Sequence, residues 1–258
     1  TLVNLSPIVN GYAGALAATR ISRLCASQNI GFTLTGSASD TPAMGPQADS
    51  TFVSLLQACA DLDRGQLFET RSSFGIGYRT RVNLQGQTPV LTADYRAATL
   101  AGSLQPTADD QFTRNQITVT RQGGTSSAVQ LASGTMSVLT PPLGVGVYSY
   151  NLTVDAFSDT QLPNLAAWML TVGTVSEYRY PGIEFDMARQ EVRNLFGIIP
   201  SLDIGDYIQV VNPPFFLQSL PIAQLAWGFT ETLNAYTWTI TINTVPESPY
   251  AQGNPPTW

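Results

Sequence analysis

Short runs that alternate apolar and polar residues dominate this sequence, and each run ends at turn-forming residues. The clearest is "TWTITINTVP", residues 237–246, in which Trp238, Ile240 and Ile242 alternate with polar residues. A period of two residues is typical of a β-strand with one buried face. Further strand-like runs lie at residues 30–37, 66–81, 115–133, 146–157, 178–189 and 222–246. The fold must therefore be built largely from short strands.

Turn residues join several of these runs into hairpins. Ser72, Ser73, Phe74 and Gly75 separate two extended runs, "QLFET" and "GIGYRTR". A Gly-Gly pair at residues 123–124 separates two more, and "TLNA" joins the last two strands of the chain. Glycine and small polar residues between alternating runs are the usual signal of a β-hairpin.

Three segments predict helices, because their apolar residues recur at spacings of three and four. They are residues 12–28, a segment that begins after Asp49 or Ser50 and stops at "DRGQ", and residues 158–174. Asp49 or Ser50 is the expected cap of the second helix, and Asp159 or Thr160 that of the third. Pro163 fits the first turn of the third helix, where its missing N–H is tolerated.

This mixture of two or three helices and some ten strands predicts an α+β fold with small barrel or sandwich modules. The sequence "VLTPPLGVGV", residues 138–147, is rich in proline and glycine and suggests a boundary. We therefore expect two domains, residues 1–140 with helices and strands and residues 141–258 rich in strands with one helix. Residues 88–113 look irregular, with one helical turn at "DYRAATL".

Charged residues make up only 12% of the chain, about half the usual share, while hydrophobic residues make up 43%. A surface with so few charges favours a member of an assembly over a free monomer. The net charge is -6, and the 12 positive residues, all arginine, are scattered singly. This argues against a nucleic-acid partner. No apolar run is long enough for a membrane span.

The chain has no histidine and no lysine. It therefore lacks the commonest general base, the commonest metal-binding side chain and any amine for a Schiff base. Cys25 and Cys59 lie in helix-like stretches and are expected to be buried free thiols, with a single bridge as the alternative. We expect no enzyme activity, no catalytic residue, no cofactor and no metal.

The stretch "SLDIGDYIQVVNPP", residues 201–214, places two aspartates around a glycine, just before an apolar strand. Asp203 and Asp206 could form a metal or acid–base pair, but a calcium loop needs several more oxygen ligands. We expect a structural turn, in which Gly205 adopts a positive φ and Asp206 accepts a hydrogen bond from a nearby backbone N–H. The two prolines that follow should end the strand.

Other candidate residues have a structural explanation that is at least as good as a functional one. The pairs Asp61 with Asp63 and Asp109 with Asp110 lie near turns and should cap helices or be solvated. Neither Gly-x-Gly motif, "GIGYR" or "GVGVY", completes a dinucleotide fingerprint. The aromatic residues of the second half suit core and interface packing, with sugar stacking as the alternative; they are Tyr148, Tyr150, Trp168, Tyr178 and Tyr180.

The order of these pieces resembles that of tail-hub or minor tail proteins of long-tailed bacteriophages, especially phages of actinobacteria. The first half has a helix, then the hairpin "GQLFETRSSFGIGYRTR" with Arg79 and Arg81 on its second strand. The second half has "RYPGIEFDMAR", then a Gly-Asp corner and an apolar strand. The residues that match the family's pattern there are Gly205, Asp206, Gly228, Phe229, Glu231 and Trp238. The resemblance covers about residues 10–248.

The resemblance implies a structural subunit of the virion that forms a ring near the tail tip, often a trimer. Its partners would be other copies of itself and the neighbouring tail-tube and tail-tip proteins. Two other classes remain open: a carbohydrate-binding module of the tail tip, and a cell-wall hydrolase that uses carboxylates. The six glutamates show no pattern of two acids facing one cleft.

Overall fold

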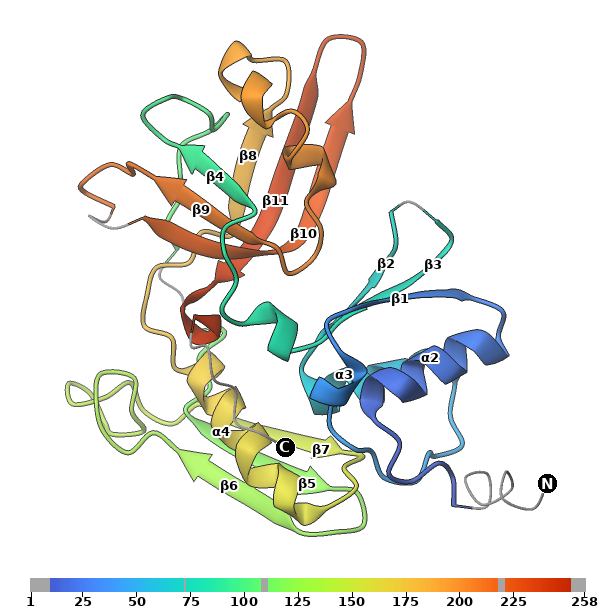
Figure 1. Ribbon diagram of the computed structural model, residues 1–258. Helices are drawn as coiled ribbons and strands as arrows, with labels where there is room; N and C mark the ends of the chain where they lie inside the picture. The colour runs from blue at the N-terminus through green and yellow to red at the C-terminus, as the bar shows by residue number, and fades with distance from the viewer. Residues whose placement is uncertain (1–9, 72, 108–110, 218–220, 252–258) are drawn as a thin grey trace. The chain divides into compact units, whose positions relative to one another are not determined.

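The computed structural model describes residues 10–71, 73–107, 111–217 and 221–251, which form two compact units (Figure 1). Unit 1 contains residues 10–71, 73–85 and 112–176, and unit 2 contains the other described residues. The chain therefore passes between the units near residues 85, 111 and 176, and not within residues 138–147. The predicted α+β class is confirmed, with helices α2–α4 and strands β1–β11 in the described residues.

The first half of unit 1 combines two helices with a three-stranded sheet. Its elements are α2 (Ala17–Ser27), β1 (Gly31–Thr35), α3 (Phe52–Asp63), β2 (Gln66–Glu69) and β3 (Gly75–Arg79). The order in the sheet is β1-β3-β2. The β2–β3 hairpin was predicted from its turn residues, whereas the parallel pairing of β3 with β1 was not predicted.

Both helices are somewhat shorter than the sequence predicted. α2 begins at Ala17 rather than near residue 12, because the chain before it makes hydrogen-bonded turns. The cap of α3 is neither Asp49 nor Ser50 but Thr51, whose hydroxyl accepts a hydrogen bond from the Ser54 N–H at 3.3 Å. α3 ends at Asp63, and the residue that caps it, Arg64, adopts a left-handed conformation with φ of 61°.

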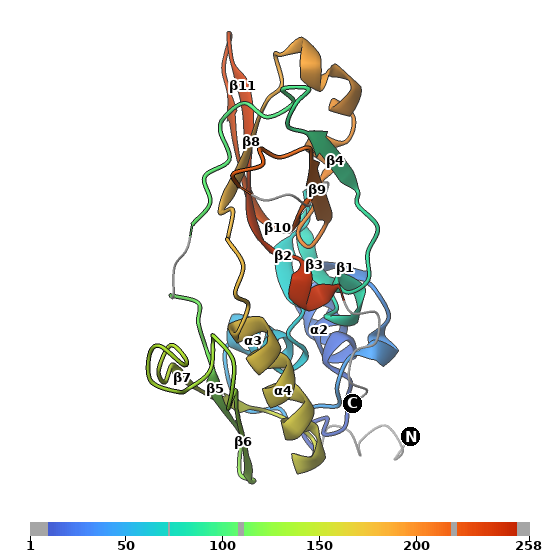
Figure 2. The ribbon, with the colours of Figure 1, turned by 90° about the vertical axis from the view of Figure 1, so that its left-hand side faces the viewer.

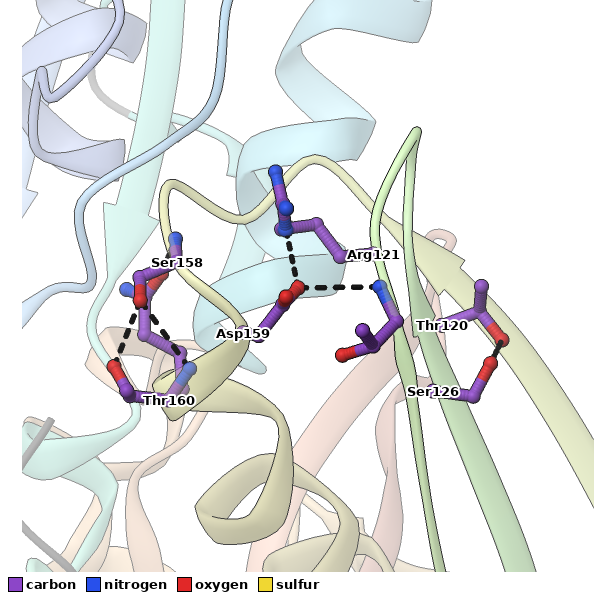
Figure 3. Close-up of polar contacts among 8 residues, drawn as sticks. Thr120, Arg121, Ser126, Ser158, Asp159 and Thr160 are labelled. Carbon is purple, nitrogen blue, oxygen red and sulfur yellow. Dashed lines mark hydrogen bonds and ion pairs between the residues drawn. The ribbon is translucent and has the colours of Figure 1, made fainter.

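The second half of unit 1 is a sheet of order β6-β5-β7 with a helix packed on β5 and β6 (Figure 2). Its elements are β5 (Gln116–Arg121), β6 (Ser126–Gln130), β7 (Ser149–Val154) and α4 (Leu162–Gly173). Figure 3 shows how the start of the helix is held to the β5–β6 hairpin. Arg121 forms an ion pair with Asp159, which also accepts a hydrogen bond from the Thr125 N–H at 3.3 Å.

The approach to α4 carries a capping box. Ser158 caps the short helical turn Asp159–Gln161, and the Gln161 side chain bonds back to the Ser158 N–H at 3.0 Å. The cap is therefore Ser158, which lies one residue before the first of the two predicted caps, Asp159 and Thr160. Pro163 lies in the first turn, as predicted.

A buried asparagine explains why residues 138–147 are not a domain boundary. The Asn115 amide nitrogen donates to the carbonyls of Met136 and Gly146 at 3.0 and 2.7 Å. Its oxygen accepts from the Tyr148 N–H at 2.8 Å. The Pro- and Gly-rich loop is thereby fastened to the start of β5, and the chain returns as β7 to the same sheet.

A buried ion pair ties three distant segments of unit 1 together. The Arg20 guanidinium, 1% exposed, contacts Asp155 at 2.8 Å. It also donates to the carbonyls of Tyr12 and Gly45. Burial raises the pKa of Asp155, and the Arg20 charge opposes this shift. The pair thus satisfies charges that would be costly if either were left alone.

Unit 2 is built on one sheet of order β4-β9-β10-β11-β8. Its strands are β4 (Leu91–Asp94), β8 (Gly182–Asp186), β9 (Tyr207–Val211), β10 (Ile222–Leu233) and β11 (Trp238–Pro246). The strand-like run at residues 178–189 contains β8, and its alternate residues Ile183, Phe185 and Met187 are all buried. The segment "EVRNLFGII" forms short helical turns that contribute Val192 and Ile199 to the same core.

Residues 88–113 were predicted to be irregular, and this was wrong for β4. Only Leu91 and Ala93 alternate inward, a pattern too short to stand out in the sequence. The strand forms because it pairs in parallel with β9, which lies far along the chain. A hydrogen-bonded turn, rather than a helix, follows at residues 95–98.

We expect Asp155→Ala to destabilise the chain by roughly 3 kcal/mol, because it leaves the Arg20 charge buried without its carboxylate. Chemical denaturation monitored by circular dichroism would measure this. The matched control is Asp61→Ala, since Asp61 is partly exposed and contacts the surface side chains of Gln57 at 2.9 Å and Arg64 at 3.9 Å, and its loss should cost less than about 1 kcal/mol. Equal effects of the two substitutions would contradict the assigned role of Arg20.

Candidate functional site

The Gly-Asp corner before β9 has the geometry of a turn. Gly205 has φ of 86°, in the left-handed region that favours glycine. One carboxylate oxygen of Asp206 accepts a hydrogen bond from the Asp203 N–H at 2.8 Å, and the Asp206 N–H donates to the Asp203 carbonyl at 3.1 Å. Asp203 in turn accepts from the Ile204 N–H at 2.8 Å. Both carboxylates therefore serve local backbone donors.

The same corner fastens β9 to its neighbours. The Gly205 N–H donates to the Ala226 carbonyl at 2.7 Å, and the Ala226 N–H donates to the Asp206 carbonyl at 2.9 Å. The Gln87 side chain donates to the Gly205 carbonyl at 2.8 Å. The described residues contain no group of three or more Cys, Asp or Glu side chains placed to hold a metal ion. The corner thus acts as the start of a strand pairing.

Asp63 lies in a polar cluster that the sequence did not predict. We expected it to cap a helix or to be solvated, and this was wrong, because it is fully buried at the end of α3. It accepts a hydrogen bond from the Tyr78 hydroxyl at 2.6 Å and from the Arg81 N–H at 3.2 Å. The Arg81 guanidinium, also buried, lies 5.1 Å from the centre of the Trp168 ring.

Burial raises the pKa of Asp63 from 3.8 to about 6, although Tyr78 and Arg81 oppose the shift. The position of Asp63 in the last turn of α3 adds to the cost of its negative charge. The cluster joins α3 to β3 and to the segment that follows β3. The cluster contains no nucleophile placed beside a base. Its role is therefore structural: it holds the end of α3 against β3.

Asp61 lies at the surface of α3, where Gln57 donates to it at 2.9 Å. Asp109 and Asp110 lie outside the described residues. Asp61 and Asp155 both line a hollow of about 400 Å³ between α3 and β7. Both carboxylates are engaged there, Asp155 by Arg20 and Asp61 by Gln57, which leaves neither placed as a free catalytic acid.

One pair of glutamates in unit 2 resembles an acid–base pair more closely. Glu247 is buried, and burial together with the nearby Glu177 charge raises its pKa. Glu177 accepts a hydrogen bond from the Ser248 hydroxyl. A carboxylic acid with a raised pKa beside a second carboxylate is the pairing that glycosidases use. This pair could not be recognised from the sequence, because its two members lie 70 residues apart.

The two cysteines are free and buried, as expected. Burial raises the pKa of Cys59 to about 12 and also raises that of Cys25. Neither thiol therefore ionises near neutral pH, and a thiolate nucleophile is excluded at both positions.

The five aromatic residues of the second half are divided between the units. Tyr148, Tyr150 and Trp168 belong to unit 1, and Tyr178 and Tyr180 belong to unit 2. Trp168 and Tyr180 are buried, whereas Tyr178 is 52% exposed. A sugar-stacking platform needs exposed rings, so the buried two do not contribute to one.

Large apolar side chains are exposed at several turns instead. They include Phe74, Leu143, Phe215, Phe216, Leu233 and Tyr236. They are spread over separate turns, and the exposed fractions of Phe74 and Tyr236 both reach 92%. No helix in the described part of the chain has the length and apolar character that a membrane crossing requires.

No protein-family model and no curated protein matches this sequence. Two solved structures share its fold. One is the 43 kDa tail protein of prophage MuSo2 from Shewanella oneidensis, with 8% identity, a TM-score of 0.56 and coverage of 92% of this chain and 65% of that chain. The other is the tail protein from Neisseria meningitidis MC58, with 12% identity, a TM-score of 0.60 and coverage of 93% and 70%.

The predicted likeness to phage tail proteins is therefore confirmed at the level of the fold. This chain spans 65% and 70% of the lengths of the two proteins. Both matches extend over more than nine tenths of the chain, and so over both units.

We expect Gly205→Val to lower stability by more than about 1 kcal/mol, because a β-branched side chain is strained at positive φ. Asp203→Asn should be nearly silent, since an amide oxygen can still accept the Ile204 N–H. Thermal melting of the two variants, with and without a chelator, measures the difference. A chelator or Asp203→Asn that lowers the melting temperature as much as Gly205→Val would show a metal site.

We also expect Asp63 to make stability depend on pH. Because its pKa is higher in the folded state, its contribution to stability is fully present below pH 3.8 and is lost as the pH rises through about 6. The difference in unfolding free energy between Asp63→Asn and the parent chain should therefore change by roughly 2 kcal/mol in favour of Asp63→Asn between pH 4 and 7. Denaturant titrations across this range give the difference, and a flat difference would contradict it.

Proposed function

We propose that this chain is a structural subunit of a bacteriophage tail. The observation that carries the proposal is the shared fold with two phage tail proteins over more than nine tenths of the chain. The described carboxylates and thiols support a structural role as well, because most of them are engaged in hydrogen bonds, ion pairs or the core.

More specifically, we propose a trimeric hub ring at the tail tip that joins the tail tube to the host-recognition proteins. The low share of charged residues and the apolar side chains exposed at turns support contacts with other subunits. Closed rings use head-to-tail contacts between unlike surfaces. The use of arginine alone as the positive residue fits a GC-rich genome, which agrees with an actinobacterial host.

The ring proposal predicts that the purified chain assembles through an interface of well over about 1,000 Å² per subunit. Analytical ultracentrifugation over a wide concentration range should show a discrete oligomer of three copies. Imaging of the virion should show the same copy number at the tail tip. A chain that stays monomeric at the highest soluble concentration, or a single peripheral copy in the virion, would refute the ring.

The Glu177–Glu247 pair suggests one other function, hydrolysis of cell-wall glycan, which can be tested directly. If the chain were a carboxylate hydrolase of cell-wall glycan, Glu247→Gln would abolish turnover, whereas Glu69→Gln at the surface would not. We expect no turnover of peptidoglycan by the parent chain. We likewise expect no specific binding on a glycan array, which would otherwise favour a carbohydrate-binding module.

A further inference from the structure

The longest hairpin of unit 2 extends beyond the strands that flank it (Figures 1 and 2). β9 pairs with β10 only over Ile222–Leu225, and the Gly205–Asp206 corner continues the pairing to Ala226. A bulge follows between Ala226 and Gly228. Beyond it, no described strand lies along the outer side of β10. We call Thr230–Leu233, which is exposed, the arm edge.

The end of this hairpin is held in one conformation. The Asn234 side-chain oxygen accepts from the N–H groups of Tyr236 and Thr237, both at 2.9 Å, and its backbone N–H donates to the Thr237 carbonyl at 2.9 Å. The Trp238 indole donates to Glu231 at 2.6 Å across the hairpin. A strand edge that is already ordered loses little entropy when it docks.

The arm edge has fewer of the features that protect strand edges from pairing than the outer strands of the sheet, although the bulge at Ala226–Gly228 lies beside it. β4 and β8, at the two sides of the sheet, are short, follow Pro89 and Pro181 closely, and carry acidic residues. The β8 edge also receives a hydrogen bond from the Ala101 N–H. The arm edge has no proline or lysine, and Glu231 is its one charged residue. Natural proteins rarely leave such an edge open in their working state.

Side chains beside the arm edge would add contact area to such a pairing. Leu233 is 69% exposed and Tyr236 is 92% exposed. Tyrosine is among the residues that most often anchor interfaces. Both side chains lie at the end of the arm edge, where an extended strand that pairs with the edge would come close to them.

If the partner of the arm edge is another copy of the chain, the two surfaces that meet must carry few charges. Two copies of net charge -6 repel each other. Only Glu231 carries a charge between Tyr207 and Pro246, and the longest stretch without any charge is residues 122–154. That second stretch contains β6, the outer strand of its sheet in unit 1.

β6 has the properties that the arm edge requires of a partner. Ser126–Gln130 contains no charge and no proline, and its residues alternate between exposed and half-buried. The loop that follows exposes Leu139, Leu143 and Val147, with Leu143 at 71%. Small hydroxyl residues occur in both edges, as Thr230 and Thr232 in one and Ser126 and Ser127 in the other. Such residues pair well across strands.

We propose that the arm edge of one copy pairs with the outer edge of β6 in the next copy. This inference rests on the proposed ring and names the surfaces through which its subunits meet. The two edges belong to different units and are unlike, so the contact is head-to-tail and can close a ring. Pairing of two arm edges with each other would instead give a two-fold dimer.

Disulfide trapping tests this contact in the full chain. Thr232→Cys combined with Ala128→Cys, or with Ser126→Cys to allow a shifted register, should give disulfide-linked oligomers under mild oxidation. The native Cys25 and Cys59 are buried and should stay unlinked. Each single variant is a control, and so is Thr232→Cys with Thr92→Cys, because Thr92 is exposed on the protected edge strand β4. Linking by Thr232→Cys alone would show arm-to-arm pairing and overturn the proposal.

Charge substitution provides an independent readout. Thr232→Lys or Ala128→Lys should weaken assembly at least about tenfold, because a lysine protects a strand edge, whereas Thr92→Lys should not. Combining Thr232→Lys with Ala128→Glu should restore assembly. If the parent chain forms its ring and both lysine variants do so equally well, the edge pairing is refuted and the ring stands. If linked open chains form but no closed oligomer does, the edge pairing stands and the ring is refuted. A parent chain without assembly and without trapping refutes both.

Discussion

The parallel pairing of β7 with β5 determines how this chain divides into units. The pairing runs from Gln116 opposite Ser149 to Arg121 opposite Val154. It brings the chain back to the sheet after the β5–β6 hairpin and the Pro- and Gly-rich loop, and Asn115 holds that loop from the residue just before β5. Because parallel strands need a long connection, the loop that looks like a boundary in the sequence is the crossover of a single sheet. α4 can then pack on β5 and β6.

The distance along the chain between paired strands explains which parts of the fold could be predicted from the sequence. Hairpins and helices have local signals, and β2–β3, β5–β6, β10–β11, α3 and α4 were all expected near their observed positions. Periodicity along the chain does not reveal a partner strand far away. The parallel pairs β1–β3 and β4–β9 were therefore not predicted, and β4 itself was missed because its four residues depend on β9.

The polar sites also differ in whether adjacent residues or distant parts of the chain determine them. The turn at Gly205 is encoded by adjacent residues, so its geometry could be reasoned from the sequence. The burial of Asp63 depends on Tyr78 and Arg81, which lie on another strand and beyond it. One local signal was available, since Leu56, Cys59 and Asp63 have helical spacing and so share the buried face of α3. The Glu177–Glu247 pair had no comparable signal, because only the folding of unit 2 brings its members together.

Although this chain has few charged side chains, several of them are buried in its interior. Arg20, Arg81 and Asp63 are buried, so the surface carries even fewer charges than the composition suggests. Copies of such a chain have few opportunities to form ion pairs with each other, and their net charges repel. Backbone hydrogen bonds at open strand edges do not depend on side-chain charge, and salt screens the repulsion while leaving these bonds in place. The scarcity of charge and the presence of open strand edges are therefore complementary properties: the first removes the usual means of subunit recognition, and the second supplies another.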